Sequence, residues 1–356
     1  MGELILHIGT RKTGTSALQK FFKYNREALL RNGVDYVQFT RQKALTFLTS
    51  RNGVFLTEYF RALVLQEEAN NRVSDFEENY NRLANALKGE QRVLISDENF
   101  SNYEYMSDGV QYDMEKFWRE AARAVKELGS SKTTVIVYLR RQDEYVISNW
   151  KEKVRSGYTD KPFRDYLNHA DRKYELNYNM LLDAIRSSFE SSANIIVRSY
   201  NQVECSGADI SLDFCESLGI PWNNDYRIPK ERANPSISLD MAEALLTCKY
   251  GGHGRSKEEK RMRKQLANAL CRNHPDPKGT TLFSPGEAEA LMEQYKDENH
   301  RIEKEYFDNR KLFSEEFGTG PVWHPDRLLI AKYRAAFLCP KISKLLSCGG
   351  RRIWEK

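Results

Sequence analysis

The feature that most constrains the fold of this chain is a strand, a glycine-containing loop and a helix within residues 4 to 22. Leu4 to Ile8 is a short apolar run, which predicts a buried strand. Leu18, Phe21 and Phe22 recur at helical spacing, so the loop leads into a helix. At such a junction the backbone N–H groups and the positive end of the helix dipole converge, and together they favour a bound anion.

The residues of the loop narrow the choice of anion. Gly9 and Gly14 have the spacing of the Walker A loop, G-x-x-x-x-G-K-[ST], and Ser16 occupies its hydroxyl position. Thr15 stands at the lysine position, however, and the lysine of this loop is Lys12, before the second glycine. A loop for ATP or GTP needs its lysine after that glycine to reach the β- and γ-phosphates. The sequence therefore predicts a phosphate loop, but a poor NTPase loop.

Beyond the loop, strand signals alternate with helix signals as far as about residue 230. Further strands are expected at residues 34–37, 91–96, 133–139 and 194–200. Helices are expected from the loop to 33, within 57–88, at 111–128, from 140 to 155, at 177–190 and at 208–218. This alternation predicts an α/β fold, a P-loop-like parallel sheet flanked by helices, with ligands at the carboxyl ends of the strands.

The C-terminal third has a different pattern. Residues 236–356 lack strand signals and carry helical runs at 237–249, 256–272 and 285–308. We therefore expect a core over residues 1–235 and a helical C-terminal extension over residues 236–356. The extension would bind an acceptor or pack on the core.

The loop sequence Lys-Thr-Gly-Thr-Ser, after a strand and at the start of a helix, resembles the 5′-phosphosulfate loop of sulfotransferases that use 3′-phosphoadenosine 5′-phosphosulfate (PAPS). Arg11 stands where the cytosolic branch usually has proline. The resemblance implies that the phosphosulfate is bound by Arg11, Lys12, Thr13, Gly14, Thr15 and Ser16. Lys12 would stabilise the charge that grows on the leaving adenosine bisphosphate. The alternative is an ordinary strand-to-helix turn with incidental hydroxyls.

A second motif of that family follows the strand at 133–139. The family has an arginine at a strand end and a serine eight residues later, which together hold the 3′-phosphate, and Arg140 and Ser148 match this spacing. An arginine binds phosphate through two parallel hydrogen bonds. Arg141 competes for the role, although its eighth following residue is Asn149. The alternative is a solvated start of a helix.

The acceptor hydroxyl must lose a proton, so a carboxylate or histidine is needed within reach. Glu98 lies just past a predicted central strand, and the resemblance to carbohydrate sulfotransferases supports it as the base. Glu98 could instead cap a helix or pair with a basic neighbour. His7 is the alternative base, although a histidine inside a strand is more often a core residue. We expect no metal, and Asp97 is only a faint Walker B-like candidate.

The resemblance covers about residues 3 to 236. Its last segment runs from Lys230 to Ser236 and would bring Lys230 or Arg232 near the 3′-phosphate. The Arg-Lys-Gly segment of the cytosolic branch is not recognisable here.

Composition bounds the remaining possibilities. With 356 residues, 40% of them hydrophobic and 29% charged, the chain is globular rather than disordered. The net charge of +5 suits an anionic ligand but falls short of a nucleic-acid-binding profile. No stretch reaches the roughly 18 to 20 apolar residues of a membrane span, and the first strand begins too early for a signal peptide.

The cysteine pattern bears on the compartment in which the protein is found. The six cysteines are scattered and form no disulfide framework, so we expect a cytoplasmic protein. One group of residues loosely matches the spacing of a zinc site: Cys248, His253, Cys271 and His274. The simpler interpretation is that these are ordinary buried or surface residues. The tail from Lys341 to Lys356 mixes apolar and basic residues and could contact a membrane surface or pack on the core.

These observations favour a PAPS-dependent sulfotransferase that acts on a hydroxyl acceptor, which we expect to be a saccharide or glycan precursor. PAPS would be the co-substrate, and no nucleic-acid partner is expected. Two alternatives stay open: a P-loop kinase of small molecules, and a non-catalytic nucleotide-binding module.

Overall fold

The computed structural model describes residues 1–39, 51–65, 76–89, 91–102, 113–169, 172–206, 209–222, 225–228, 236–247, 257–271, 274–315 and 320–338. The chain forms two compact units, each built from three segments. The first contains Met1–Arg141, Lys173–Ala233 and Tyr295–Ser314, and the second contains Gln142–Arg172, Asn234–Gln294 and Glu315–Lys356. The functional division expected at residue 235 stays a prediction. The compact units do not divide the chain at that point, because residues 142–172 belong to the same unit as most of the C-terminal part.

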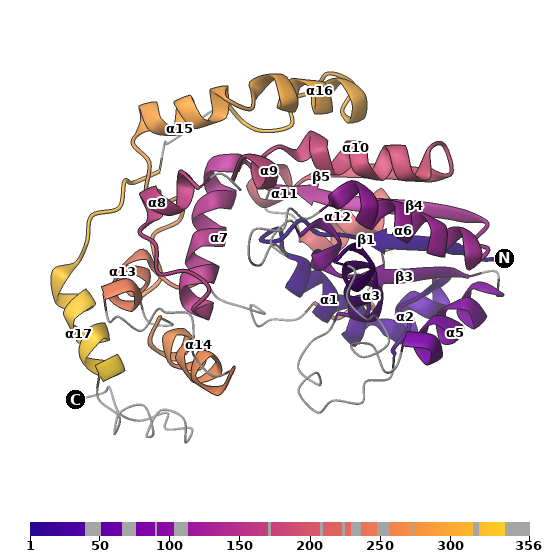
Figure 1. Ribbon diagram of the computed structural model, residues 1–356, viewed down its shortest axis with the longest axis horizontal. Coiled ribbons are helices and arrows are strands. Elements are labelled where there is room, and N and C mark those ends of the chain that lie inside the picture. The colour runs from indigo at the N-terminus through magenta and orange to yellow at the C-terminus, as the bar shows by residue number, and fades with distance from the viewer. Residues whose placement is uncertain are drawn as a thin grey trace. The chain divides into compact units, whose positions relative to one another are not determined.

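The first unit is built on a five-stranded sheet (Figure 1). Its strands are β1 (Glu3–His7), β2 (Val34–Asp35), β3 (Arg92–Ser96), β4 (Lys132–Leu139) and β5 (Ala193–Ser199). Every pair is parallel and the order is β2-β3-β1-β4-β5, which confirms the predicted α/β fold with a parallel sheet. β1 lies between β3 and β4, and the chain forms β2 and β3 on one side of β1 before it crosses to β4 and β5 on the other. The carboxyl end of β1 is therefore the switch point at which such sheets bind ligands.

Helices cover both faces of this sheet. On one face α1 (Thr15–Tyr24) and α12 (Ile210–Ser217) bury Phe21, Phe22 and Phe214 against Ile5 and Ile136 of the strands. On the other face α6 (Met114–Glu127) packs on α3 (Val54–Val64) and α10 (Tyr178–Phe189). Apolar residues at helical spacing thus form two cores around strands that are apolar on both sides.

The helix expected to run from the loop to residue 33 is wrong in one respect. It is two helices, α1 and α2 (Arg26–Arg31), which meet at Asn25. The Asn25 amide donates to the carbonyls of Phe21 and Arg227, at 2.9 Å each, and its Oδ1 accepts from the Arg227 N–H at 2.7 Å. The side chain competes with the helix for backbone partners, which explains the break.

The remaining helices of the first unit are α5 (Phe76–Leu87), α11 (Tyr200–Ser206) and α16 (Lys296–Tyr306), with a 3-10 turn η2 (Glu98–Ser101) after β3. The helical run expected at 285–308 is interrupted, since α15 (Pro285–Glu293) belongs to the second unit and α16 to the first. Arg301 of α16 binds both Asp183 oxygens of α10 at 2.8 and 2.7 Å, which fixes α16 to this unit.

The second unit is helical throughout its described elements. It contains α7 (Gln142–Ser156), α8 (Phe163–Leu167), α13 (Leu239–Thr247), α14 (Lys257–Cys271), α15 and α17 (Arg327–Leu338). A partly buried ion pair joins Lys151 of α7 to Asp276 at 2.7 Å, and the same carboxylate accepts from the Leu239 N–H at the start of α13. Helical packing of the C-terminal part agrees with the sequence prediction.

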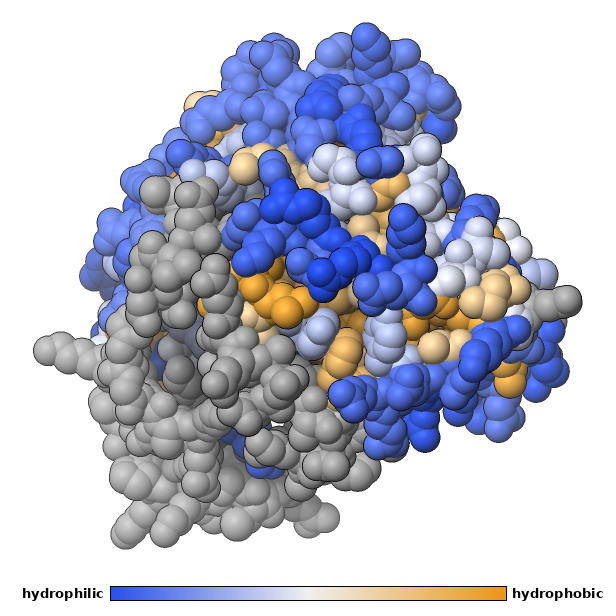
Figure 2. Space-filling view, turned by 45° about the vertical axis from the view of Figure 1, so that its right-hand side comes forward, coloured by the Kyte–Doolittle hydropathy of each residue, from blue (hydrophilic) through white to orange (hydrophobic). Residues whose placement is uncertain are grey.

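Hydrophilic residues dominate the described surface that faces the viewer in Figure 2, with apolar residues between them, as is usual for a globular protein. None of the described helices is long and apolar enough to cross a membrane.

Candidate functional site

The loop between β1 and α1 is fixed by backbone hydrogen bonds to the end of β4. The Tyr138 N–H donates to the Gly9 carbonyl at 2.6 Å, and the Thr10 N–H donates to the Tyr138 carbonyl at 2.8 Å. The hydroxyls of Thr13 and Thr15 both donate to the Thr10 carbonyl, at 2.6 and 3.2 Å. These two hydroxyls therefore shape the loop from inside, and their predicted bonds to a ligand stay a prediction.

The glycines of the loop have positive φ, 97° at Gly9 and 77° at Gly14, a region that favours glycine. Gly14 is the N-cap of α1, and its carbonyl accepts from the Ala17 and Leu18 N–H groups at 2.8 and 3.1 Å. The N–H groups of this first turn form the positive end of the helix dipole. Lys12 also has a positive φ, 66°, and is partly exposed, as are Arg11 and Ser16. This arrangement of helix N-terminus and two cations is suited to an anion with phosphate-like charge.

Arg140, just past β4, lies against this loop. Its Nη1 donates to the Lys12 carbonyl at 3.1 Å, and its guanidinium lies over the Tyr200 ring at 5.4 Å. The Arg140 carbonyl accepts from the Tyr178 hydroxyl at 2.5 Å, which fixes the backbone at this strand end. The structure thus brings Arg140 to the loop between β1 and α1 through contacts that the sequence could not specify.

The other residues predicted to hold the 3′-phosphate are placed differently. Ser148 is a partly exposed residue of α7 and belongs to the second compact unit, whereas Arg140 belongs to the first. Their joint binding of phosphate stays a prediction. Lys230 and Arg232 lie outside the described residues.

Glu98 is the first residue of η2 and lies beside the loop. A Cβ at Gly9 would stand 3.2 Å from the Glu98 Cβ and 3.3 Å from its Cα, so a side chain at this position would crowd Glu98. The Glu98 carboxylate accepts from Gln19 Nε2 at 3.1 Å and pairs with Arg51 Nη1 at 3.6 Å. The side chain is 21% exposed, so the carboxylate is anchored but reachable.

Asp97, rather than Glu98, caps the short helix η2. Its buried carboxylate accepts from the Asn99 N–H at 2.9 Å and pairs with Arg51 at 3.3 Å. The Thr57 hydroxyl donates to the same group at 3.4 Å. Asp97 is thus engaged in holding η2 against α3.

His7 is a core residue. It is fully buried, it contacts the rings of Phe22, Tyr138 and Phe214 edge-on, and burial lowers its pKa from 6.5 to about 3. Its Nδ1 lies 2.8 Å from the Ser96 hydroxyl. A neutral imidazole that is fully buried cannot reach the hydroxyl of an acceptor substrate. The structure therefore favours His7 as a core residue over His7 as the base.

Two residues near Glu98 were not predicted. Gln19 lies one turn into α1, and Arg51 follows a long stretch without a strong pattern. A polar Gln19 next to Leu18 on an apolar helix face is the one sequence signal that could have pointed to a buried hydrogen bond.

For the zinc hypothesis, Cys248 and His253 lie outside the described residues. Cys271 is buried, its pKa is raised by that burial, and its sulfur lies 3.8 Å from the Ser238 hydroxyl. Within the described ranges no three His, Cys, Asp or Glu side chains are grouped so that they could hold a metal ion.

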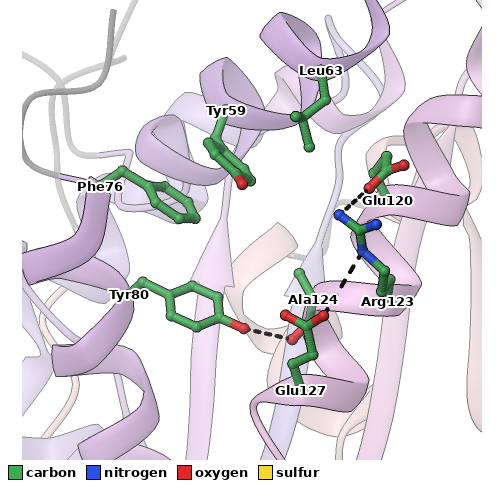
Figure 3. Close-up of a pocket in the computed structure, with 8 residues that line it drawn as sticks. All are labelled: Tyr59, Leu63, Phe76, Tyr80, Glu120, Arg123, Ala124 and Glu127. Atoms are coloured by element: carbon green, nitrogen blue, oxygen red, sulfur yellow. Dashed lines mark hydrogen bonds and ion pairs between the residues drawn. The ribbon is translucent and has the colours of Figure 1, made fainter. Parts of the chain in front are cut away.

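A separate hollow lies between α3, α5 and α6 (Figure 3). Its charged residues pair with one another, Arg123 with Glu120 at 2.8 Å and with Glu127 at 3.8 Å, and the Tyr80 hydroxyl donates to the Ala124 carbonyl. Burial, with Glu127 second, raises the pKa of Tyr80 to about 12. The volume of about 100 Å³ is too small for a nucleotide, and none of the predicted site residues lines it.

No family model matches the chain. A protein of Archaeoglobus fulgidus described as uncharacterized is 28% identical over 193 residues, which is 53% of this chain and 50% of the relative, so the match spans about half the length of each. Among solved structures, a sulfotransferase from Alicyclobacillus acidocaldarius has a TM-score of 0.39 and 13% identity, covering 77% of this chain and 96% of that one.

The sulfotransferase domain from the curacin biosynthetic pathway has a TM-score of 0.34 and 12% identity, covering 63% of this chain and 76% of that one. At such TM-scores these likenesses carry no argument about activity.

Proposed function

We propose that this protein transfers the sulfuryl group of PAPS to a hydroxyl acceptor. One observation carries the proposal: the ends of the adjacent strands β3, β1 and β4 bring Glu98, the phosphate loop and Arg140 to one edge of the sheet. A carboxylate, with Lys12 and Arg140 as cations around a helix N-terminus, is what a hydroxyl acceptor and a donor with two anionic groups require.

The cationic groups around the loop fit PAPS better than a nucleoside triphosphate. The lysine lies before Gly14, in the tight turn of the loop, and Arg140 supplies a second phosphate-binding fork from the next strand. The N–H groups of α1 and the Lys12 ammonium would hold the 5′-phosphosulfate. Arg140, with Ser148, Lys230 and Arg232 as further proposed ligands, would hold the 3′-phosphate.

The reaction that this arrangement supports is an in-line transfer. The acceptor oxygen attacks sulfur, the bond from sulfur to the bridging oxygen of the 5′-phosphate breaks, and adenosine 3′,5′-bisphosphate leaves with the electron pair. Glu98 takes the acceptor proton. Lys12 and the helix N-terminus stabilise the negative charge that appears on the bridging oxygen.

We take the acceptor to be a saccharide or glycan precursor, since the carboxylate beside the loop suits alcohol hydroxyls that need a base. The test is transfer from radiolabelled PAPS to a panel of saccharides, phenols and steroid alcohols, with product separated by chromatography. Glu98→Gln should lower the rate about a hundredfold or more without weakening adenosine bisphosphate binding. A Glu98→Gln protein with the wild-type rate would remove Glu98 as base, and phosphoryl transfer from ATP would support the kinase alternative.

A further inference from the structure

A buried chain of hydrogen bonds leads from the Glu98 carboxylate into the core. Gln19 Nε2 donates to Glu98 Oε2 at 3.1 Å and to the Ser96 hydroxyl at 3.3 Å. The Ser96 Oγ lies 2.8 Å from His7 Nδ1. Gln19 is 3% exposed, and Ser96 and His7 are fully buried. The chain therefore connects β1, α1 and β3 behind the candidate base.

The two N–H bonds of the Gln19 amide serve Glu98 and Ser96. The Ser96 hydroxyl accepts from Gln19 and is also bonded to His7 Nδ1, in a direction that the tautomer of the ring decides. Turning the Gln19 amide over would place its oxygen against the Glu98 carboxylate and lose the donation to Ser96.

The consequence for Glu98 is a fixed carboxylate. Its Oε2 is held by Gln19, while its Oε1 faces Arg51 at a longer distance of 3.6 Å. Gln19 stands on α1, the same helix whose N-terminus forms the anion site, so one rigid element relates the two.

We propose that Gln19 is a positioning residue that orients the Glu98 carboxylate toward the acceptor hydroxyl, with Ser96 fixing the Gln19 amide. This inference rests on the proposed function of Glu98 as the base. A buried glutamine that merely stabilises the fold would affect unfolding but would show no dependence on Glu98.

The first test is the slow release of inorganic sulfate from PAPS, in which water replaces the unidentified acceptor hydroxyl. Gln19→Met keeps the length of the side chain and removes its donors. We expect its rate to fall about tenfold to a hundredfold, as is typical for a displaced catalytic group. The same change in a Glu98→Gln background should have little further effect. Lys20→Met, the neighbouring position on α1, should keep the wild-type rate.

A second measurement needs no turnover. The side-chain amide signals of Gln19 in a nitrogen–hydrogen NMR spectrum, assigned by their loss in Gln19→Met, should shift on Glu98→Gln and again on Ser96→Ala. Adenosine bisphosphate titration of Gln19→Met reports the donor site separately and should match the wild type, so failure of the donor site is distinguished from failure of this inference. The positioning role would be overturned if the Gln19 signals did not shift on Glu98→Gln. It would also be overturned if Gln19→Met lowered the rate equally in the wild type and in the Glu98→Gln background.

Discussion

At the scale of single residues, Gly14 carries two constraints at once. Its φ of 77° favours glycine, and a Cβ there would stand 2.8 Å from Ile210 Cδ1 and 3.2 Å from Tyr200 Cε2. Gly33 has the same φ of 77° but no atom within 4 Å of the corresponding Cβ. Comparing substitutions at Gly14 and Gly33 therefore separates the cost of backbone strain from the cost of steric conflict.

We expect Gly33→Ala to lower the free energy of unfolding by about 1–2 kcal/mol, the usual strain of a left-handed alanine. Gly14→Ala should cost more and should also weaken adenosine bisphosphate binding, because the Cβ must also displace the end of Ile210 and press on the Tyr200 ring. Urea unfolding of both variants measures the difference. Equal losses in the two variants would show that the loop does not pack as described.

The buried His7 makes stability depend on pH. Because its pKa falls from 6.5 when unfolded to about 3 when folded, the unfolded chain binds an extra proton below pH 6.5. Stability is therefore unaffected above about pH 6.5 and is lost as the pH falls toward 3. Between pH 7 and 5 the His7 contribution is roughly 2 kcal/mol.

The measurement is urea unfolding of wild type and His7→Phe at both pH values. The wild type should lose more stability than the variant over this interval, by about the His7 contribution. Parallel pH dependence of the two proteins would contradict a neutral, buried His7.

At the scale of secondary structure, the sequence predicted the strands and most helices well, because apolar periodicity is a local property. It missed the break between α1 and α2, because the Asn25 partner Arg227 lies 202 positions away. It also missed Gln19 and Arg51 as partners of Glu98. Glu98 and Arg140 could be anticipated from their place at strand ends, whereas contacts made across the fold could not.

Asn25→Ala tests the cause of this break. The variant loses the bonds of a nearly buried amide to Phe21 and Arg227, so we expect a loss of about 1–3 kcal/mol in the free energy of unfolding. The control is Asn85→Ala, which removes an exposed bond to Lys88 and should change stability by less than about 0.5 kcal/mol.

At the scale of the whole molecule, the strand order decides which predicted residues meet. Sequence alone predicts a parallel sheet but not that β1 lies between β3 and β4, since order arises from long-range pairing. That order brings the loop after β1, Glu98 and Arg140 to neighbouring strand ends.

Because the proposed donor site is cationic, its affinity should depend on salt. We expect the affinity for adenosine 3′,5′-bisphosphate to fall several-fold when the salt concentration rises from low to about 0.5 M, and to fall less in Lys12→Ala, which has one charge fewer. Calorimetric titration at both salt concentrations measures this. An affinity that does not change with salt would contradict a site built on charge.

The most direct test of the central claim compares adenosine 3′,5′-bisphosphate, adenosine 5′-monophosphate and ATP-Mg²⁺ by calorimetry, on wild type, Arg140→Ala and Arg141→Ala. The account predicts that wild type and Arg141→Ala bind the bisphosphate at least about tenfold more tightly than the monophosphate, and that Arg140→Ala loses this preference. A preference for ATP-Mg²⁺, or equal binding of the two adenosine nucleotides by wild type, would contradict a PAPS site.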